Sequence, residues 1–97
     1  MFVVLLKFSN NKGQGGQFME SHNAWIKRGF DEGVFLLTGT IQPKSGGGIL
    51  AHGVSLAELR ARVNDDPFVM HDVVSVEILE ITPGRTDARL DFLRADG

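Results

Sequence analysis

The sequence contains no cysteine, which excludes disulfide bonds, thiolate nucleophiles and cysteine-ligated metal sites. It also lacks a large excess of charge of either sign, and the formal net charge of −2 gives no electrostatic reason to expect nucleic acid or an anionic membrane as a partner. The apolar start, Met1 to Lys7, is far shorter than a membrane span and lacks the basic leader and cleavage site of a signal peptide. We therefore expect a cytoplasmic protein with no membrane partner.

The remaining composition is that of one small globular domain. Of the 97 residues, 42% are hydrophobic and 23% are charged, which argues against disorder. A domain of this length buries only about two thirds of the surface that its unfolded chain exposes. We expect marginal stability unless the chain oligomerises.

The hydrophobic pattern predicts four strands and two helices in the order β-α-β-β-α-β. Strands are expected at Phe2–Phe8, Val34–Ile41, Ile49–Val54 and Val73–Ile81, helices at Gln17–Glu32 and from Ser55 to just before Pro67, a flexible loop at Asn10–Gly16 and a turn at Gln42–Gly48. Gly33 is expected to cap the first helix, and Ser55 with Glu58 has the form of a capping box. Gly39 interrupts its strand, where a bulge or a close approach by a ligand is expected.

This order predicts an α+β, ferredoxin-like fold with an antiparallel sheet and both helices on one face. Residues 1–82 would form the domain, and residues 83–97 a tail that either frays or lies over a partner subunit. On the first strand, Phe2, Val4, Leu6 and Phe8 point one way and Val3, Leu5 and Lys7 the other, so the face without helices is also partly apolar. We expect a homodimer packed sheet against sheet.

Two residues far apart in the sequence are the candidates for chemistry. His22 shares the apolar face of the first helix with aromatic residues that include Phe18 and Trp25. Asp66 precedes Pro67, which pushes it out of the α region, so we expect its carboxylate to point at another group rather than to cap a helix. A histidine whose Nδ1–H donates to a carboxylate has its other nitrogen available for proton transfer. The alternative is that His22 fills the helix–sheet interface and Asp66 ends a helix, since structural ion pairs also occur in cores.

Three stretches together resemble the YciI-like (YCII-related) family: His22-Asn23-Ala24-Trp25-Ile26, Gly33-Val34-Phe35-Leu36-Leu37-Thr38-Gly39 and Asp66-Pro67-Phe68. The resemblance covers about residues 1–82. It implies a dimeric α/β barrel of ferredoxin-like subunits, with a pocket in each subunit that holds a His-Asp pair at the positions of His22 and Asp66. One relative in that family is a dehydrochlorinase that acts on a chlorinated hydroxyhydroquinone.

The chain departs from the family pattern at two places. The turn before His22 often carries an arginine in the family, whereas here Phe18-Met19-Glu20-Ser21 occupies it, which suggests a more apolar or neutral ligand. The family often has Gly-Pro after the second strand, whereas this chain has Gly39-Thr40, so a hydroxyl group is expected to face the pocket.

Two functions remain open at this point. The first is a small, cofactor-free enzyme that uses His22 and Asp66 for acid/base chemistry on a small cyclic or aromatic compound, as a lyase, isomerase or dehydrohalogenase. The second is a non-catalytic module that binds a small ligand or another protein. RNA binding through the same topology is discarded, because the third strand has no aromatic residue.

The other candidate residues have weaker signals. Trp25, Thr40, Phe68 and His71 are candidates for the pocket wall, although Trp25, Phe30 and Phe68 also suit the core and His71 suits the surface. His52 has no assigned position. The three histidines and the carboxylates lack the spacing of a metal site, so no metal or cofactor is predicted.

Overall fold

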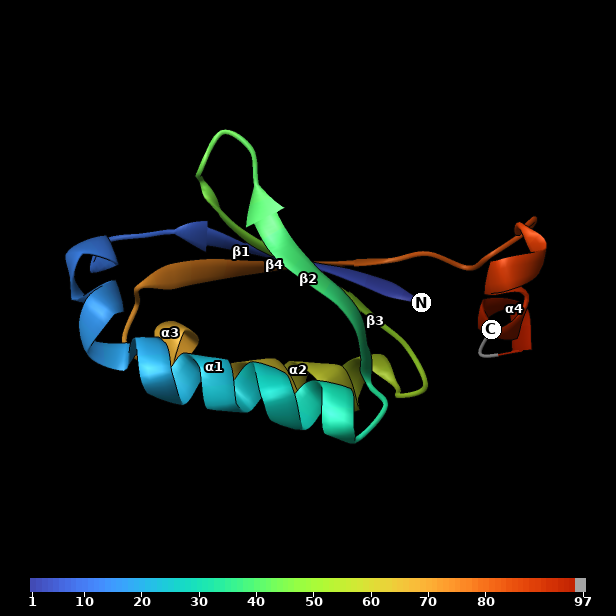
Figure 1. Cartoon of the computed structure of the whole chain (residues 1–97), viewed down its shortest axis with the longest axis horizontal. Helices are drawn as coiled ribbons and strands as arrows, with labels where there is room; N and C mark the ends of the chain where they lie inside the picture. Colours follow the sequence, from blue (N-terminus) through green and yellow to red (C-terminus); the bar gives the residue numbers. More distant parts are fainter. Residues whose placement is uncertain (96–97) are drawn as a thin grey trace.

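The computed structural model describes residues 1–95 of the chain. Four antiparallel strands form one sheet in the order β2-β3-β1-β4. The main helices α1, α2 and α3 lie on one side of this sheet (Figure 1). The elements are β1 (Phe2–Phe8), η1 (Lys12–Gln14), α1 (Gly15–Asp31), β2 (Phe35–Ile41), β3 (Gly46–Ala51), α2 (Leu56–Asn64), α3 (Pro67–Met70), β4 (Val74–Glu80), η2 (Ala88–Leu90) and α4 (Phe92–Ala95). The predicted ferredoxin-like α+β fold is confirmed.

The register of β1 explains how the sheet buries its core. Val4 lies opposite both Ile49 of β3 and Ile78 of β4, so β1 is a central strand, as its apolar run predicted. Because side chains alternate along a strand, Phe2, Val4 and Leu6 share the face covered by the helices and are buried. The predicted direction of Phe8 is retained, but its ring is 41% exposed at the end of the strand.

Helix α1 packs on the sheet through a point of close approach. Trp25 is buried at the centre of this interface, and Gly29 lies directly against the ring of Phe35. A Cβ atom at Gly29 would fall 2.1 Å from a carbon of that ring, so glycine sets the distance between α1 and β2. Phe30, which the sequence placed in the core, is instead 42% exposed and touches Phe35 edge to face. It lies at the margin of the helical stripe.

Two predicted helix boundaries are confirmed. Gly33 has a φ of 74°, the left-handed conformation expected of a C-terminal glycine cap. At α2 the Ser55 hydroxyl accepts from the Glu58 N–H at 3.1 Å, and the Ser55 N–H donates to the Glu58 carboxylate at 3.1 Å. The Ser55 N–H that donates to the Glu58 carboxylate holds the pKa of Glu58 below its usual value.

Several boundaries differ from the predictions. The stretch from Asn10 to Gly16 is a 3₁₀ turn followed by the start of α1, and it is held by hydrogen bonds from the Asn11 N–H to the Asp72 carbonyl and from the Asn11 amide to the His71 carbonyl. Strand β3 begins at Gly46, so the glycine run is paired sheet rather than turn. The irregularity of β2 lies between Phe35 and Leu37, not at Gly39. The local sequence did not indicate the ordered turn at Asn11 or the early start of β3, because Asn11 and β3 bond to residues far away in the chain.

The sheet face opposite the helices carries apolar side chains. Val3 is opposite Leu50 on one side and Leu79 on the other, and Leu50 is in turn opposite Leu37. Leu37 and Leu79 are 52% and 44% exposed. We call this group of four residues the open-face cluster.

The C-terminal segment is structured up to Ala95. Helix α4 lies at the opposite end of the molecule from the β2–β3 turn (Figure 1). Leu93 is 4% exposed, and the ring of Phe92 meets that of His52 edge to face with centroids 5.4 Å apart. Residues 96–97 of the predicted tail lie outside the described residues, and its contact with a partner subunit stays a prediction.

Within residues 1–95, no helix has the length and apolar character needed to cross a membrane.

We expect Gly29→Ala to lower the free energy of unfolding by about 1–3 kcal/mol, because the added methyl group would overlap the Phe35 ring. Urea denaturation monitored by circular dichroism measures this change. Gly16→Ala is the matched control in the same helix, since a Cβ atom there meets nothing within 4 Å. Equal effects of the two substitutions would contradict the proposed helix–sheet contact.

Candidate functional site

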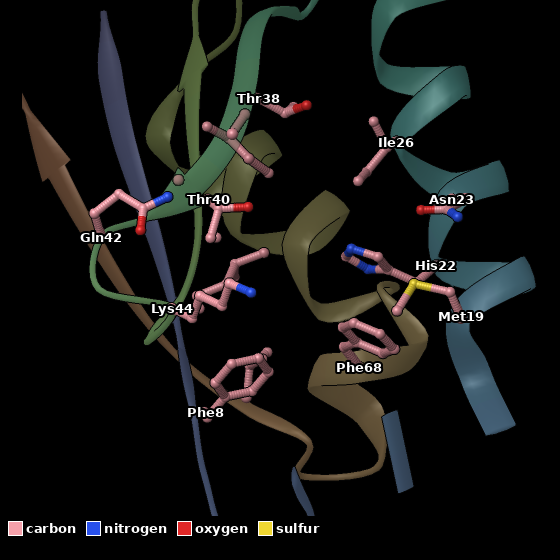
Figure 2. Close-up of a pocket in the computed structure, with 17 residues that line it drawn as sticks. Phe8, Met19, His22, Asn23, Ile26, Thr38, Thr40, Gln42, Lys44 and Phe68 are labelled. Carbon is pink, nitrogen blue, oxygen red and sulfur yellow. The ribbon is translucent and has the colours of Figure 1, made fainter. Parts of the chain in front are cut away.

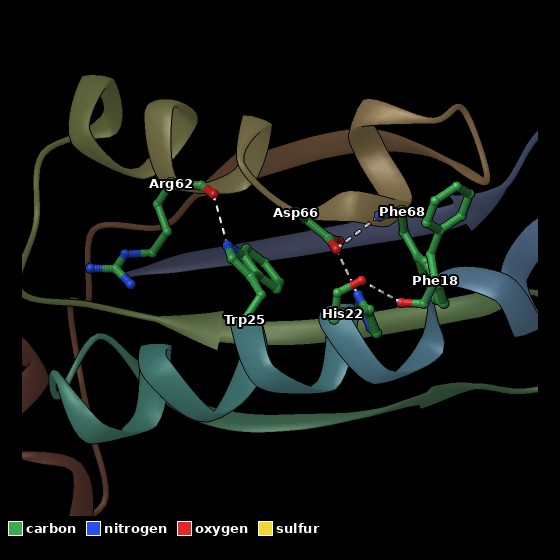
Figure 3. A network of polar contacts seen from close by, with 7 residues as sticks. Phe18, His22, Trp25, Arg62, Asp66 and Phe68 are labelled. Atoms are coloured by element: carbon green, nitrogen blue, oxygen red, sulfur yellow. Dashed lines mark hydrogen bonds and ion pairs between the residues drawn. The ribbon is translucent and has the colours of Figure 1, made fainter.

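His22 and Asp66 form a buried pair between α1 and the residue that precedes α3. The Nδ1 atom of His22 lies 2.7 Å from Oδ1 of Asp66. His22 is 9% exposed and Asp66 is 0% exposed. Since an ionised carboxylate can only accept hydrogen bonds, His22 donates from Nδ1–H, which leaves its Nε2 as the second ring nitrogen. The structure thus brings together the two residues that the sequence singled out (Figure 3).

Asp66 also caps α3, contrary to the prediction that it would not cap a helix. Its Oδ1 atom accepts from the Phe68 N–H at 3.0 Å, and Pro67 occupies the first turn of α3. Proline is favoured there because its missing N–H would have no partner inside the helix. The extended conformation expected before a proline is present, with φ −65° and ψ 124°. One oxygen therefore serves both the cap and the imidazole, while Oδ2 is buried without a hydrogen-bond partner among the described residues.

The imidazole plane is fixed by stacking. The ring of Phe68 lies parallel to that of His22, with centroids 3.9 Å apart and planes inclined by 5°. A second stack, between Phe18 and His71, has a centroid separation of 4.0 Å and an inclination of 4°. Each stack joins α1 to the α3 region. Phe68 covers one face of the His22 ring, and Asp66 binds the ring at its Nδ1 edge.

His22 faces a cavity of about 480 Å³ between α1 and the β2–β3 hairpin (Figure 2). This volume lies within the range of small-molecule sites. The floor is apolar, with Leu6, Ile26 and Ile49 among its residues. The polar side chains that line it are His22, Asn23, Thr38, Thr40, Gln42 and Lys44.

The predicted pocket residues divide into two groups. Thr40 and Phe68 line the cavity together with His22. Trp25 does not; it is buried in the core, and its Nε1–H donates to the Arg62 carbonyl at 2.9 Å. His71 does not line it either, because it stacks on Phe18. Asp66 lies behind His22.

Sequence reasoning missed most of the wall contributed by the hairpin. Gln42 and Lys44 belong to a segment expected to be only a turn. Thr38 lies two positions before Thr40 on β2, so strand alternation could have placed it on the same face. Asn23 and Met19 lie near His22 on α1, so their places could have been inferred from helical spacing. Gln42 and Lys44 had no such local signal.

A glycine leaves room for the cavity. Gly47 is opposite Leu6 on β1 and Thr40 on β2, so it faces the helices. The atom nearest to a Cβ built there is the Gly39 carbonyl oxygen at 3.5 Å, which is ordinary contact. A larger side chain would therefore project into the cavity without displacing the backbone.

The described residues contain no group of three or more histidine and carboxylate side chains that could hold a metal ion. What the site presents is a positioned imidazole at the wall of a largely apolar cavity, with a carboxylate behind it. Such a group can accept a proton from a bound molecule and return it.

We expect Gly47→Val to abolish binding of a small aromatic probe such as phenol, because the added side chain would fill part of the cavity. Chemical-shift changes of the cavity residues in ¹⁵N-correlated NMR spectra measure the binding. Gly84→Val is the control, since Gly84 lies outside the cavity and a Cβ atom there meets nothing within 4 Å. Equal probe binding by the two variants would show that the probe does not occupy this cavity.

Comparison with known proteins adds information on the fold. Neither a protein-family model nor a curated protein matches the sequence. The structure is similar to 5-chloro-2-hydroxyhydroquinone dehydrochlorinase from Burkholderia phenoliruptrix AC1100, solved in complex with 2,5-dihydroxybenzoquinone. The TM-score is 0.69 at 12% sequence identity, and the match covers 87% of this chain and 96% of the other. At this identity the similarity establishes a shared fold.

Proposed function

We propose that this protein is a small, cofactor-free enzyme that performs acid/base chemistry on a small cyclic or aromatic compound. The observation that carries the proposal is the 2.7 Å contact between His22 Nδ1 and the fully buried Asp66, at the wall of the cavity. His22 is the proton-transfer group, and Asp66 is a positioning residue. The reaction class is that of a lyase, isomerase or dehydrohalogenase.

The roles follow from the geometry. With Nδ1–H engaged by Asp66, the lone pair of Nε2 accepts a proton from a hydroxyl group or an acidic carbon of the substrate. The imidazolium that forms is stabilised by the adjacent carboxylate, and its Nε2–H returns the proton to the product, to a leaving group or to water. Proton transfer by a positioned side chain of this kind contributes about 10²- to 10⁴-fold to a rate.

The fold comparison supports the substrate class. The similar protein is a dehydrochlorinase whose structure holds a dihydroxybenzoquinone, which is a planar ring of a size that suits a cavity of about 480 Å³. Together with the three sequence stretches around His22, Gly33 and Asp66, this similarity supports membership of the YciI-like family. The substrate class and the family membership are both parts of the proposal.

The protein is also proposed to be a homodimer. The open-face cluster, Val3, Leu37, Leu50 and Leu79, places four aliphatic side chains on the sheet face that the helices leave bare. Burying such a face against a second copy would add the apolar contact that a chain of 97 residues lacks. The dimer would leave the cavity intact, because the cavity lies on the other side of the sheet.

Substitution of Asp66 tests the acid/base proposal before any substrate is known. In Asp66→Ala, no side-chain oxygen accepts from Nδ1–H of His22, so we expect the Nδ1–H tautomer to lose its preference over the Nε2–H tautomer. Long-range ¹H–¹⁵N NMR spectra distinguish the two tautomers. An unchanged His22 tautomer in a folded variant would contradict the positioning role. His71→Gln is the control, and it should leave the His22 signals unchanged.

Turnover is then tested with hydroxylated and halogenated ring compounds, by halide release and by uptake of solvent deuterium. We expect His22→Gln to lower the rate by about 10²- to 10⁴-fold. Asp66→Asn should lower it as well and alter its pH profile, whereas His71→Gln should not. Turnover that survives His22→Gln would contradict the proposal, and binding without turnover throughout the panel would favour a ligand-binding module.

The dimer is tested by sedimentation. We expect the wild type to have twice the mass of one chain. Leu79→Lys should raise the dissociation constant at least about tenfold, because the interface would bury an unpaired ammonium group. Met70→Lys is the control, since Met70 is 63% exposed on α3, on the helix side of the sheet. A monomeric wild type, or equal effects of the two substitutions, would refute this interface.

A further inference from the structure

The cavity has a distinct charge. Among the described residues that line it there is no aspartate or glutamate, and Lys44 carries its one permanent positive charge. The nearest carboxylate of the site, Asp66, is 0% exposed and lies behind His22. The cavity wall therefore presents a cation and several neutral polar groups, and no anion to balance them.

Lys44 differs from the other lysines in its surroundings. Lys27 pairs with Asp31 at 2.7 Å, Lys7 lies 4.0 Å from Glu77, and Lys12 lies over the Phe8 ring at 5.1 Å from its centroid. Lys44 has no ion pair with any residue of the described part of the chain. Its ammonium group is available to a ligand.

The position of Lys44 is defined by the main chain next to it. The Ser45 N–H donates to the Ile41 carbonyl at 3.1 Å, and the Ser45 carbonyl accepts from the Phe8 N–H at 3.0 Å. These bonds close the hairpin and attach it to β1. Lys44 consequently stands on the hairpin side of the cavity, across from His22 on α1 (Figure 2).

We propose that Lys44 is a specificity-determining residue that binds an anionic oxygen, so that the substrate is a small ring compound carrying a carboxylate or an ionised hydroxyl group. This inference rests on the proposed function and names its substrate class. The ring would span the cavity, with its anionic oxygen at Lys44 and its proton-donating group at His22. The anion also balances the charge that the wall presents.

The inference revises the expectation of a neutral ligand that came from the missing arginine before His22. That expectation considered only the helix that carries His22. The structure supplies a cation from the opposite wall, 22 positions along the chain from His22. Thr40 and Gln42, from the same hairpin, add hydrogen-bonding groups beside it.

The test uses matched probes of nearly equal shape and different charge: benzoate with benzamide, and 4-nitrophenolate with 4-nitroaniline. Dissociation constants are measured by NMR titration of the cavity residues. We expect the wild type to bind each anion about tenfold more tightly than its neutral partner, with the difference decreasing as salt is added. Lys44→Met should bring each pair to parity, and Lys44→Arg should restore most of the preference.

Lys27→Met is the matched control, because it removes the same charge from a lysine on α1 that lies outside the cavity. It should retain the preference for anions. An equal affinity for the anion and its neutral partner in the wild type, no saturable binding of either anion, or an equal loss in the two methionine variants would overturn the role of Lys44.

The failure of this inference can be distinguished from failure of the acid/base proposal. His22→Gln should retain the Lys44-dependent preference for anions while it lowers turnover by about 10²- to 10⁴-fold. If the wild type prefers anions through Lys44 but turns over none of the ring compounds, the role of Lys44 is supported and the acid/base proposal is refuted. If neutral ring compounds are turned over at rates that Lys44→Met leaves unchanged, the acid/base proposal is supported and the anion-binding role of Lys44 is refuted.

Discussion

The hydrogen bond between His22 and Asp66 is the interaction on which the arrangement of the site depends. It joins α1 to the junction of α2 and α3, and one carboxylate oxygen accepts from both the imidazole and the Phe68 N–H. Leaving a buried polar group without its hydrogen-bond partner typically costs about 1–3 kcal/mol, and more when that group is charged, as the Asp66 carboxylate is. Neighbouring groups must therefore hold both partners in place so that this hydrogen bond forms. Phe68 holds both partners, since its ring stacks on His22 and its N–H donates to Asp66.

The short helix α3 contributes both to stability and to the proposed site. Pro67 starts α3, Asp66 caps it, and Phe68 covers one face of the imidazole. Because the cap and the histidine share one oxygen, the direction of the carboxylate is set by backbone geometry rather than by a free rotamer. Positioning of this kind reduces the reorganisation needed when a proton moves. The unpartnered Oδ2 atom of Asp66 is a further sign that the site was not arranged for maximum stability alone.

The cavity arises from the shape of the sheet, which faces the helices. The sheet closes against the helices where side chains are large, at Val4, Trp25 and Phe35. It stays open toward the hairpin, where Gly47 has no side chain to fill the space. Hydrogen bonds at Ser45 hold the hairpin to β1, so the polar residues of the turn line this space. The result is a cavity with an imidazole on one wall and an ammonium group on the other.

The amino-acid sequence by itself determined the order of the elements and the ferredoxin-like topology, which follow from hydrophobic period and from glycine and serine caps. The pairing of His22 with Asp66 is what the resemblance to the YciI-like family implies, because the residues alone leave a purely structural role open. Only the tertiary structure decided that Asp66 also caps α3, that Trp25 and His71 stand outside the cavity, and that Lys44 lines it. These positions depend on strand register, on hydrogen bonds between distant loops and on the distance that Gly29 sets between α1 and β2. No local pattern contains that information, because it arises from contacts between segments far apart in the chain.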